Sequence, residues 1–309
     1  MFAFLRKHEG NVGGWSKSPT SAKLFLAVAL LLAPSLVAAK PKSTLVLVGG
    51  AMHDPALYQE VLRLAGGGQK ARVGILTTGS RPESEDPAAG TDQADNARIK
   101  GDHYIARFHH EGAATVEWIP IDLDHLDKAS SPEVVAQIAR MNVLFFGGGD
   151  QERIRAALVT KDGRDTPALA AIRRAHRAGT EIVGTSAGSV ALVRGPMITG
   201  GEGASDVTHD ARGGLGLFRL GIVDTHFSQR ARGPRLMELT RKTRARTAFG
   251  IDENTALIVQ RTSKGPRVRA LGQGNVTVYR REGGKIFESR LSAGDRFVPG
   301  SGKIKFGRK

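Results

Sequence analysis

Residues 181–192, which read EIVGTSAGSVAL, constrain the fold more than any other stretch of the chain. An apolar run typical of a strand ends in Gly-x-Ser-x-Gly, and a segment that can be helical begins at once. This order predicts a nucleophile elbow, a sharp strand-to-helix turn with Ser186 at its apex. The two glycines let the arms of the turn pass closely. The backbone N–H of Ala187 would then lie beside the Ser186 hydroxyl, as a donor to an oxyanion.

Strand and helix patterns alternate on the N-terminal side of this turn. The apolar runs predict buried strands at residues 44–48, 73–77, 115–119 and 143–146. The helical patterns cover residues 58–64, 98–110, 132–140, 152–158 and 166–178, and residues 79–96 read as a long surface loop. Repeated units of this kind predict an α/β fold with a doubly wound, mostly parallel sheet flanked by helices. Its functional sites should lie at the carboxyl ends of the strands.

The C-terminal part of the chain has a different pattern. Residues 199–216 are rich in glycine and predict a loop over the site, followed by a strand at 222–227 and a basic helix at 232–242. Residues 249–259 read as one strand that contains Asp252 and Glu253. Alternating segments such as 276–279 and 286–288 predict an antiparallel extension of the main sheet. No composition break divides residues 40–309, which we interpret as one domain.

The first 39 residues have the order of a secretory signal peptide. Basic residues precede the apolar run 24–33, and Pro34 and the small residues Val37, Ala38 and Ala39 follow it. The run is shorter than the ~20 residues that a membrane-spanning helix needs, although an N-terminal anchor or a buried helix is the alternative. We therefore expect cleavage near Ala39 and export to the periplasm or the medium, with no stable membrane anchor afterwards.

Composition excludes some chemistries. The chain has no cysteine, so it has no disulfide framework and no thiol nucleophile. Its formal net charge is +15; without the four basic residues and Glu9 of the leader, 41 Lys and Arg stand against 29 Asp and Glu, a net +12. With only 6% aromatic residues we expect no nucleic-acid binding. A basic surface suits an acidic or carboxylate-bearing substrate.

A serine nucleophile needs a base and an acid that orients it. His226 is the leading base, because it follows a short apolar strand, although a structural histidine is the alternative. Asp252 and Glu253 are both candidates for the acid, since a carboxylate in an apolar run needs a partner. The cluster Gly147–Gly149 is either a plain turn or a second backbone donor to the oxyanion.

Two further clusters of side chains need an interpretation. Arg230, Arg232 and Arg235 form either a solvated face or a grip for a substrate carboxylate. The group His103, His109, His110 and Glu111 lacks a closed set of metal ligands, so we expect no metal and no organic cofactor.

Taken in order, these motifs resemble the cyanophycinase and dipeptidase E family of serine peptidases. The resemblance runs from about residue 45 to 259 and rests on FGGGDQ at 146–151, the elbow, MITGG at 197–201, GLGL at 214–217, DTHF at 224–227 and GIDENTA at 250–256. The arginines that follow His226 favour the cyanophycinase branch. The sequence departs from the family at Thr225, where glutamine is common, and in the altered turn at residues 49–52.

The resemblance implies a class I glutamine-amidotransferase-like fold, a triad of Ser186, His226 and Glu253, and an oxyanion donor from Gly148 or Gly149 beside Ala187. It implies a substrate pocket lined by Gln151, Asp224, Arg232 and Arg235, to which the neighbouring Arg230 is added, and a homodimer. Family members of this branch cleave cyanophycin, a poly-aspartate with arginine on each side chain, to β-Asp-Arg dipeptides. Two other hypotheses stay open: a hydrolase of short aspartyl or isoaspartyl peptides, and a non-catalytic exported binding protein.

Overall fold

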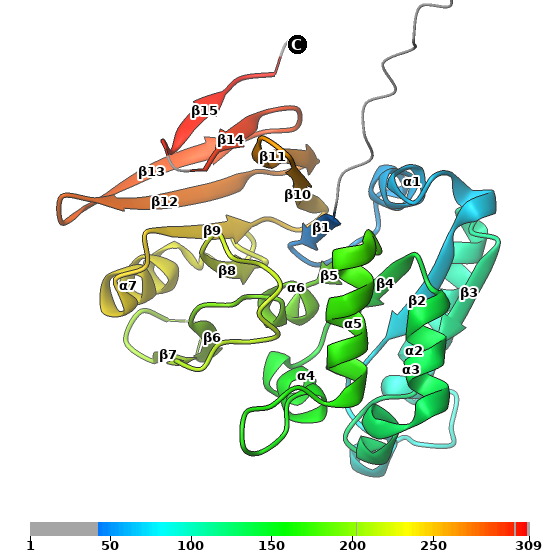
Figure 1. Cartoon of the computed structure of the whole chain (residues 1–309). Coiled ribbons are helices and arrows are strands. Elements are labelled where there is room, and N and C mark those ends of the chain that lie inside the picture. Colours follow the sequence, from blue (N-terminus) through cyan, green and yellow to red (C-terminus); the bar gives the residue numbers. More distant parts are fainter. Residues whose placement is uncertain (1–42, 202, 300, 308–309) are drawn as a thin grey trace, which may run out of the picture. The chain divides into compact units, whose positions relative to one another are not determined.

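The computed structural model describes residues 43–201, 203–299 and 301–307. Within these residues the main sheet has nine strands in the order β15-β14-β11-β10-β1-β5-β4-β2-β3. Its parallel half consists of β1 (Ser43–Val48), β5 (Glu181–Thr185), β4 (Val143–Phe146), β2 (Arg72–Leu76) and β3 (Thr115–Trp118), as Figure 1 shows. Because parallel strands end at the same edge of a sheet, the residues that follow β1, β4 and β5 are neighbours.

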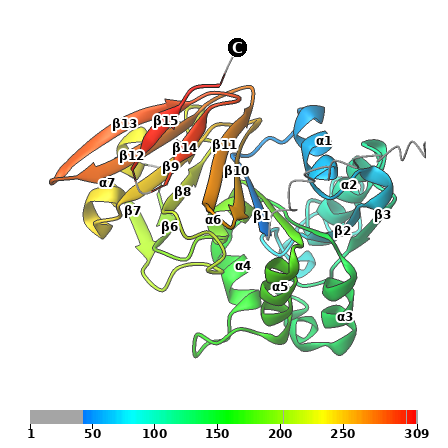
Figure 2. The same ribbon diagram turned by 45° about the horizontal axis from the view of Figure 1, so that its top comes forward.

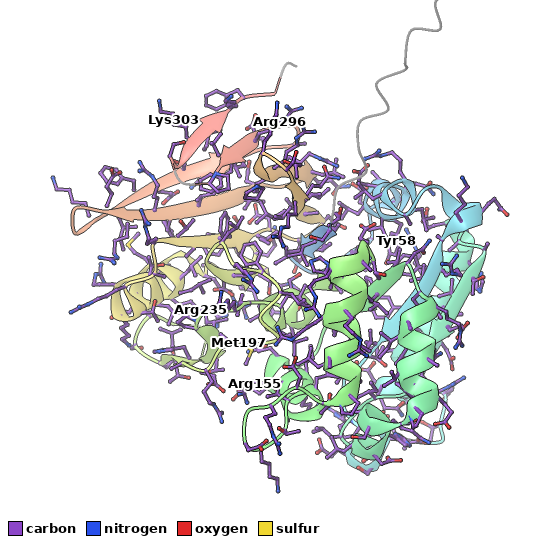
Figure 3. All side chains as sticks on the ribbon, viewed as in Figure 1. Tyr58, Arg155, Met197, Arg235, Arg296 and Lys303 are labelled. Atoms are coloured by element: carbon purple, nitrogen blue, oxygen red, sulfur yellow. The ribbon has the colours of Figure 1, made fainter. Side chains whose placement is uncertain are left out.

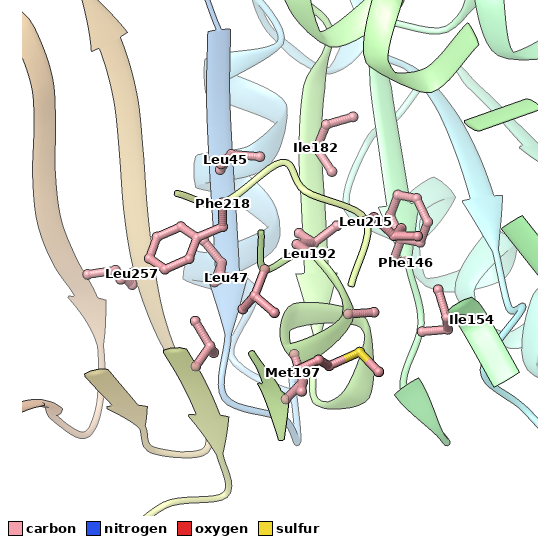
Figure 4. Close-up of a cluster of buried hydrophobic side chains, with 14 of the residues drawn as sticks. Leu45, Leu47, Phe146, Ile154, Ile182, Leu192, Met197, Leu215, Phe218 and Leu257 are labelled. Carbon is pink, nitrogen blue, oxygen red and sulfur yellow. The ribbon is translucent and has the colours of Figure 1, made fainter. Parts of the chain in front are cut away.

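Helices cover both faces of the parallel half, because successive side chains of a strand point to opposite faces. Val46 and Val48 of β1 belong to one buried cluster, together with side chains of α1 (Pro55–Leu64) and α2 (Ala97–His110). Leu45 and Leu47 belong to the other, part of which Figure 4 shows. That second cluster includes side chains of α3 (Pro132–Arg140), α4 (Gln151–Leu158), α5 (Pro167–Ala178) and α6 (Ala187–Ala191). The predicted doubly wound arrangement is therefore confirmed.

The helices begin where the sequence places capping residues. The side chains of Asp54, Asn96, Ser131, Asp150 and Thr166 each accept a hydrogen bond from a backbone N–H of the following first turn. Proline is the first helical residue of α1, α3 and α5. The predicted helices are confirmed with ends that differ by at most a few residues. In the described segments, short 3₁₀ turns occur at η1 (Gly68–Lys70), η2 (Glu83–Glu85) and η3 (Leu126–Ser130).

An antiparallel extension continues the sheet beyond β1. The strands β10 (Thr255–Thr262), β11 (Gly265–Gly272), β14 (Arg296–Val298) and β15 (Lys303–Lys305) each pair antiparallel with their neighbour. In both views these strands lie on the side of β1 that is opposite to β2 and β3 (Figures 1 and 2). The predicted C-terminal antiparallel extension is confirmed, and β1 is an interior strand as a result.

The C-terminal hairpin that we expected to extend the main sheet belongs to a second sheet instead. It has the order β13-β12-β9-β8, with β8 (Ile222–Thr225), β9 (Thr247–Ile251), β12 (Val276–Glu282) and β13 (Lys285–Leu291). β12 pairs antiparallel with β9 from Val276 opposite Ile251 to Arg280 opposite Thr247. The prediction that residues 276–288 attach to the main sheet was therefore wrong. Strand β9 pairs with β8 along one edge, and β12 pairs with its other edge.

Residues 249–259 are not one strand, as the apolar pattern had predicted. β9 ends at Ile251 and β10 begins at Thr255, and the two strands lie in different sheets. Asp252 is buried and accepts hydrogen bonds from the backbone N–H groups of Ser228 and Asn275. Asn254 then takes a left-handed backbone conformation with φ 49°. These contacts turn the chain, so the carboxylates lie in a turn and not inside a strand.

The segment 199–216 is also more regular than expected. β6 (Met197–Gly200) and β7 (Val207–Asp210) form an antiparallel hairpin, and only the remainder is irregular. Met197, Ile198 and Val207 are buried, which explains why a glycine-rich segment keeps its strands. α7 (Gly233–Thr243) packs against β7 and β9 and completes the fold.

The predicted signal peptide, residues 1–39, lies outside the described residues. No helix in the described part of the chain has both the length and the apolar composition that a bilayer crossing demands.

We expect Gly188→Ala to destabilise the fold. A Cβ at this position of α6 would lie 2.3 Å from the carbonyl oxygen of Phe146 in β4, so the helix would have to move away from the sheet. The free energy of unfolding should fall by about 2 kcal/mol or more. Gly195→Ala is the control, because a Cβ there meets nothing within 4 Å, and it should change this free energy by less than about 0.5 kcal/mol. Denaturant titration measures both; equal stability of the two variants would contradict the close approach.

Candidate active site

Ser186 lies at a strained turn between β5 and α6. Its backbone has φ 54° and ψ −125°, a conformation that L-residues rarely adopt. A Cβ on Gly184 would lie 2.7 Å from the backbone of Gly188, so only glycine allows the two arms to approach this closely. Ala187 is the first residue of α6, and its backbone N–H is therefore at a helix N-terminus. The segment has the geometry of the predicted elbow.

The structure brings the Ser186 hydroxyl and the His226 imidazole together. Ser186 Oγ lies 2.7 Å from His226 Nε2 although 40 residues separate the two in sequence. His226 directly follows β8 and has a left-handed backbone with φ 49°. This conformation turns its side chain from the end of the second sheet toward the elbow.

Glu253, and not Asp252, is the carboxylate beside the imidazole. Glu253 Oε1 lies 2.6 Å from His226 Nδ1, whereas both carboxylate oxygens of Asp252 accept backbone N–H groups. An ionised carboxylate can only accept, so Nδ1 carries the proton and Nε2 presents its lone pair to the serine hydroxyl. The three side chains thus form one hydrogen-bonded line with the tautomer that proton transfer from serine requires.

Three successive carbonyl groups at the end of β1 hold the backbone of all three segments. The carbonyl oxygen of Val48 accepts from Ser186 N (3.0 Å), and that of Gly49 accepts from His226 N (2.7 Å). The carbonyl oxygen of Gly50 accepts from the N–H of Asn254, the residue after Glu253, at 3.0 Å. The turn after β1 therefore sets the relative positions of the serine, the histidine and the glutamate.

Gly50 also provides the space for the imidazole. Its φ is 110°, and a Cβ there would lie 2.2 Å from His226 Cε1. The sequence marked residues 49–52 only as a turn that differs from the family pattern. Their contact with His226 could not be predicted, because it depends on a residue 176 positions away, from 50 to 226 in the numbering.

The glycine turn after β4 faces the elbow. A Cβ on Gly148 would lie 3.3 Å from Ser186 Cβ, and Gly149, with φ 122°, packs against the carbonyl oxygen of Gly79. Within the described part of the chain no acceptor is found for the backbone N–H of Ala187 or of Gly149. The N–H of Ala187, the residue after Ser186, and that of Gly149, the residue after Gly148, are therefore candidate donors to an oxyanion.

Tyr104 is a neighbour of this turn that the sequence did not indicate. A Cβ on Gly147 would lie 3.1 Å from Tyr104 Cε2, and the tyrosine ring packs on Phe145 with 4.7 Å between the centroids. Burial raises the pKa of Tyr104, which the nearby backbone N–H of Gly148 acts to lower. The hydroxyl therefore stays protonated at neutral pH. The only sequence signal was the spacing of Tyr104 and Phe108 on one helix face, which is typical of a core.

A buried ion cluster lies beside His226. Asp224 at the end of β8 has no exposed surface, and Arg235 binds it through both carboxylate oxygens, at 2.8 and 2.7 Å. Arg232 donates to the carbonyl oxygen of Thr225 at 2.9 Å and lies 3.5 Å from Asp224. Arg235 also donates to the carbonyl oxygen of Gly201 in the turn of the β6–β7 hairpin, at 2.9 Å. The cluster ties β8, α7 and this hairpin together.

The remaining predicted pocket residues, Gln151 and Arg230, lie outside the ion cluster. Arg230 is exposed on the loop after His226. Gln151 opens α4 and donates from Nε2 to the carbonyl oxygen of Ile198, at 3.0 Å. A solvated face, the alternative reading of the three arginines, thus describes Arg230 but not Arg232 or Arg235, which are 8% and 6% exposed.

The histidine-rich end of α2 gathers no metal ligands. Among the described residues no three His, Asp or Glu side chains are placed to hold a metal ion. Glu111 pairs instead with Arg107 and accepts from Gln59.

Comparison with known proteins yields one consistent group. The model of peptidase family S51 matches residues 87–264, a range that includes Gly148, Ser186, His226 and Glu253. Cyanophycinases of Nostoc sp. and Trichormus variabilis are each 32% identical over 256 residues, which is 80% of this chain and 78% of theirs. A solved peptidase from an acI-B1 Actinobacterium has a TM-score of 0.60 at 19% identity, covering 84% of this chain and 97% of its own; it supports the fold alone.

We expect Gly50→Ala to break the contact between His226 and Ser186. The added methyl group would overlap the imidazole ring, which has to rotate away from Oγ. The low-field NMR signal of the Nδ1–H proton, shared between His226 and Glu253, should then disappear. Gly67→Ala separates this effect from backbone strain, because Gly67 has a similar φ of 102° but open space around it, and the signal should persist. Persistence of the signal in Gly50→Ala would contradict the predicted overlap.

Proposed function

The chain belongs to peptidase family S51, a family of serine-type peptidases, and from this premise we propose that it is an exopeptidase that hydrolyses cyanophycin to β-Asp-Arg dipeptides through an acyl-enzyme. The observation that carries the mechanism is the hydrogen-bonded line Ser186–His226–Glu253. Cyanophycin is proposed as the substrate because the curated relatives share the name cyanophycinase.

In the first half-reaction Ser186 Oγ attacks the scissile carbonyl carbon while His226 Nε2 takes the hydroxyl proton. The Glu253 carboxylate, at 2.6 Å from Nδ1, stabilises the imidazolium that forms. The negative charge on the carbonyl oxygen is held by the backbone N–H of Ala187 and one from Gly148 or Gly149. Collapse of this intermediate breaks the peptide C–N bond, and the imidazolium gives its proton to the leaving amine.

In the second half-reaction a water molecule repeats these steps on the ester. His226 accepts a proton from the water as it attacks the acyl carbon, and the same N–H donors hold the oxyanion. The C–O bond to Ser186 then breaks, and the proton returns to Oγ. Apart from the water and the substrate, every group in this cycle is a side chain or backbone group of the chain itself.

The arginine cluster suits the proposed substrate. Each repeat of cyanophycin carries the free carboxylate of its arginine, and a guanidinium binds a carboxylate through two parallel hydrogen bonds. Asp224 fixes the planes of Arg235 and Arg232, so little side-chain entropy is lost on binding. We assign Gln151 and Arg230 to the borders of the same pocket. Asp224, which is wholly buried, would act by holding the arginines in place.

Short aspartyl or isoaspartyl peptides are the second candidate substrate. The same triad would cleave them, and the departure at Thr225, which is buried beside Asp224, bears on the shape of the pocket. Comparing the turnover of polymer with that of short peptides separates the two. A binding protein without catalysis no longer fits, because the family consists of serine-type peptidases.

Two finer proposals rest on the sequence. Export after cleavage near Ala39 is supported by the basic leader and the apolar run 24–33. A homodimer is supported by the family resemblance. N-terminal sequencing of the protein secreted by its host, and its mass in solution, are the direct measurements.

Ser186→Ala should abolish the release of dipeptide from cyanophycin. Loss of the nucleophile lowers kcat on the order of 10⁵- to 10⁶-fold in comparable triads, while the fold stays intact. Ser228→Ala is the control, because this exposed serine lies two residues after His226 and only its backbone is engaged, by Asp252. Products are identified by mass, and folding by circular dichroism. Turnover retained by a folded Ser186→Ala protein would remove the serine mechanism.

The neighbouring carboxylates should show opposite effects. Glu253→Gln keeps the size of the side chain but favours the wrong imidazole tautomer, and kcat should fall by about three to four powers of ten with little change in stability. Asp252→Asn replaces one acceptor oxygen of a buried carboxylate that binds two backbone N–H groups, and should lower the free energy of unfolding by about 1–3 kcal/mol with a far smaller effect on kcat. Kinetics and denaturant titration of both variants test this pair. A larger kcat loss in Asp252→Asn would show that the acid had been assigned to the wrong residue.

A further inference from the structure

A hollow lined by arginines lies on the surface next to α4. Its volume is about 490 Å³, and its lining includes Arg155, Arg173, Arg194, Arg212 and Arg219, which we call the arginine groove. They come from α4, from α5, from the segment after α6 and from the loop between β7 and β8. Four separate segments thus bring guanidinium groups to one concave surface.

The acidic residues nearby do not balance this charge. Arg155 and Arg212 share Asp210, and Arg173 pairs with Asp165. Arg194 and Arg219 are exposed, and no acidic partner for either is found in the described part of the chain. Five guanidinium groups therefore face two carboxylates, a surplus of three positive charges that attracts anions.

The segment Gly214–Gly216, which borders the arginine groove, leaves the guanidinium group of Arg173 accessible. Gly216, with φ 71°, lies so close to Arg173 that a Cβ would be 2.9 Å from Nη1. A side chain there would cover the guanidinium. The glycines of the Gly214-Leu215-Gly216 motif, which catalysis does not use, therefore allow the backbone to pack here without closing the hollow.

The groove begins next to the proposed substrate pocket. Gln151 and Arg155 are four residues apart on α4, so they lie on the same face one helical turn apart. Both contact the hairpin region: Gln151 binds Ile198 of β6, and Arg155 lies 3.5 Å from Asp210 of β7. The turn of the same hairpin binds Arg235. Figure 3 labels Arg235 and Arg155 with Met197 of β6 between them.

We propose that the arginine groove is a second binding site for the polymer substrate, which holds carboxylates of repeats beyond the one being cleaved. This inference rests on the proposed function. An enzyme that works from a chain end leaves the rest of the polymer outside the pocket, and each outer repeat carries a carboxylate that the arginine forks can bind.

A second hollow adjoins the arginine groove. Arg219 also lines this hollow of about 370 Å³, together with Arg246, Arg280 and Arg281. An extended chain that enters beside α4 can therefore continue from one hollow to the next. The lining of the arginine groove, as far as the chain is described, holds no aromatic ring on which nucleic-acid bases could stack.

The test uses the double variant Arg194→Gln/Arg219→Gln in the full mature protein. We expect kcat/KM on polymeric cyanophycin to fall about tenfold, whereas a soluble fragment of two repeats, too short to leave the pocket, should be cleaved at the wild-type rate. The defect should shrink as salt is added, because screening weakens the same contacts in the wild type. Arg290→Gln/Lys285→Gln is the matched control: it removes two positive charges from β13, and it should match the wild type on both substrates.

Binding is measured separately in a Ser186→Ala background by sedimentation with insoluble polymer. The groove variant should bind less than the control, whether or not the polymer can be cleaved. If wild-type protein cleaves neither substrate, the proposed function fails, and this binding result still decides about the groove. If the groove variant equals the control on polymer, or loses activity equally on the fragment, the second site is overturned. It is overturned as well if the groove variant loses affinity for short duplex DNA and not for the polymer.

Discussion

The end of β1 is the constraint on which the site depends. Ser186, His226 and Glu253 belong to three segments that approach from different parts of the fold, and the carbonyl groups of Val48, Gly49 and Gly50 bind the backbone of each. A backbone hydrogen bond fixes position without using a side chain, so the functional groups stay available. β1 can play this role because it is an interior strand, paired with β5 on one side and with β10 on the other.

These positions require backbone conformations that a free chain avoids. Ser186, His226 and Asn254 all have positive φ, and each such residue costs on the order of 1–3 kcal/mol. The cost is borne by the two buried clusters on either face of the sheet, which hold β1, β4 and β5 in place. Because these conformations are held by the fold, the serine hydroxyl, the imidazole and the N–H donors are in place before substrate binds. Groups arranged in advance stabilise the charge of the transition state without having to reorganise.

The elements that depend on short-range patterns could be predicted from the sequence. Those whose structure depends on contacts between distant residues could not. Apolar periodicity located the parallel strands and most helices, and Gly-x-Ser-x-Gly located the elbow. The prediction of one strand at residues 249–259 was wrong. An apolar run cannot show that Asp252 binds the backbone of Ser228 and Asn275, contacts that turn the chain between two sheets. The prediction of a loop at residues 199–216 failed for a similar reason, because the high glycine content gave no sign that Thr199 of β6 and Val207 of β7 are buried. Neither Gly50 nor Tyr104 could be assigned, because their significance lies in what they touch.

The side chains of the triad and those of the proposed substrate pocket are positioned by different forces. The triad is positioned by neutral backbone hydrogen bonds, whereas the proposed pocket is positioned by charge, through Asp224 and the arginines that it binds. A buried ion pair adds little net stability, but it leaves few alternatives for the guanidinium planes, because each displaced arrangement exposes an uncompensated charge to a low dielectric. The two systems meet in the short segment from Asp224 to His226. A change at Thr225 can therefore alter the shape of the proposed pocket while the carbonyl groups of Val48, Gly49 and Gly50 continue to hold the triad.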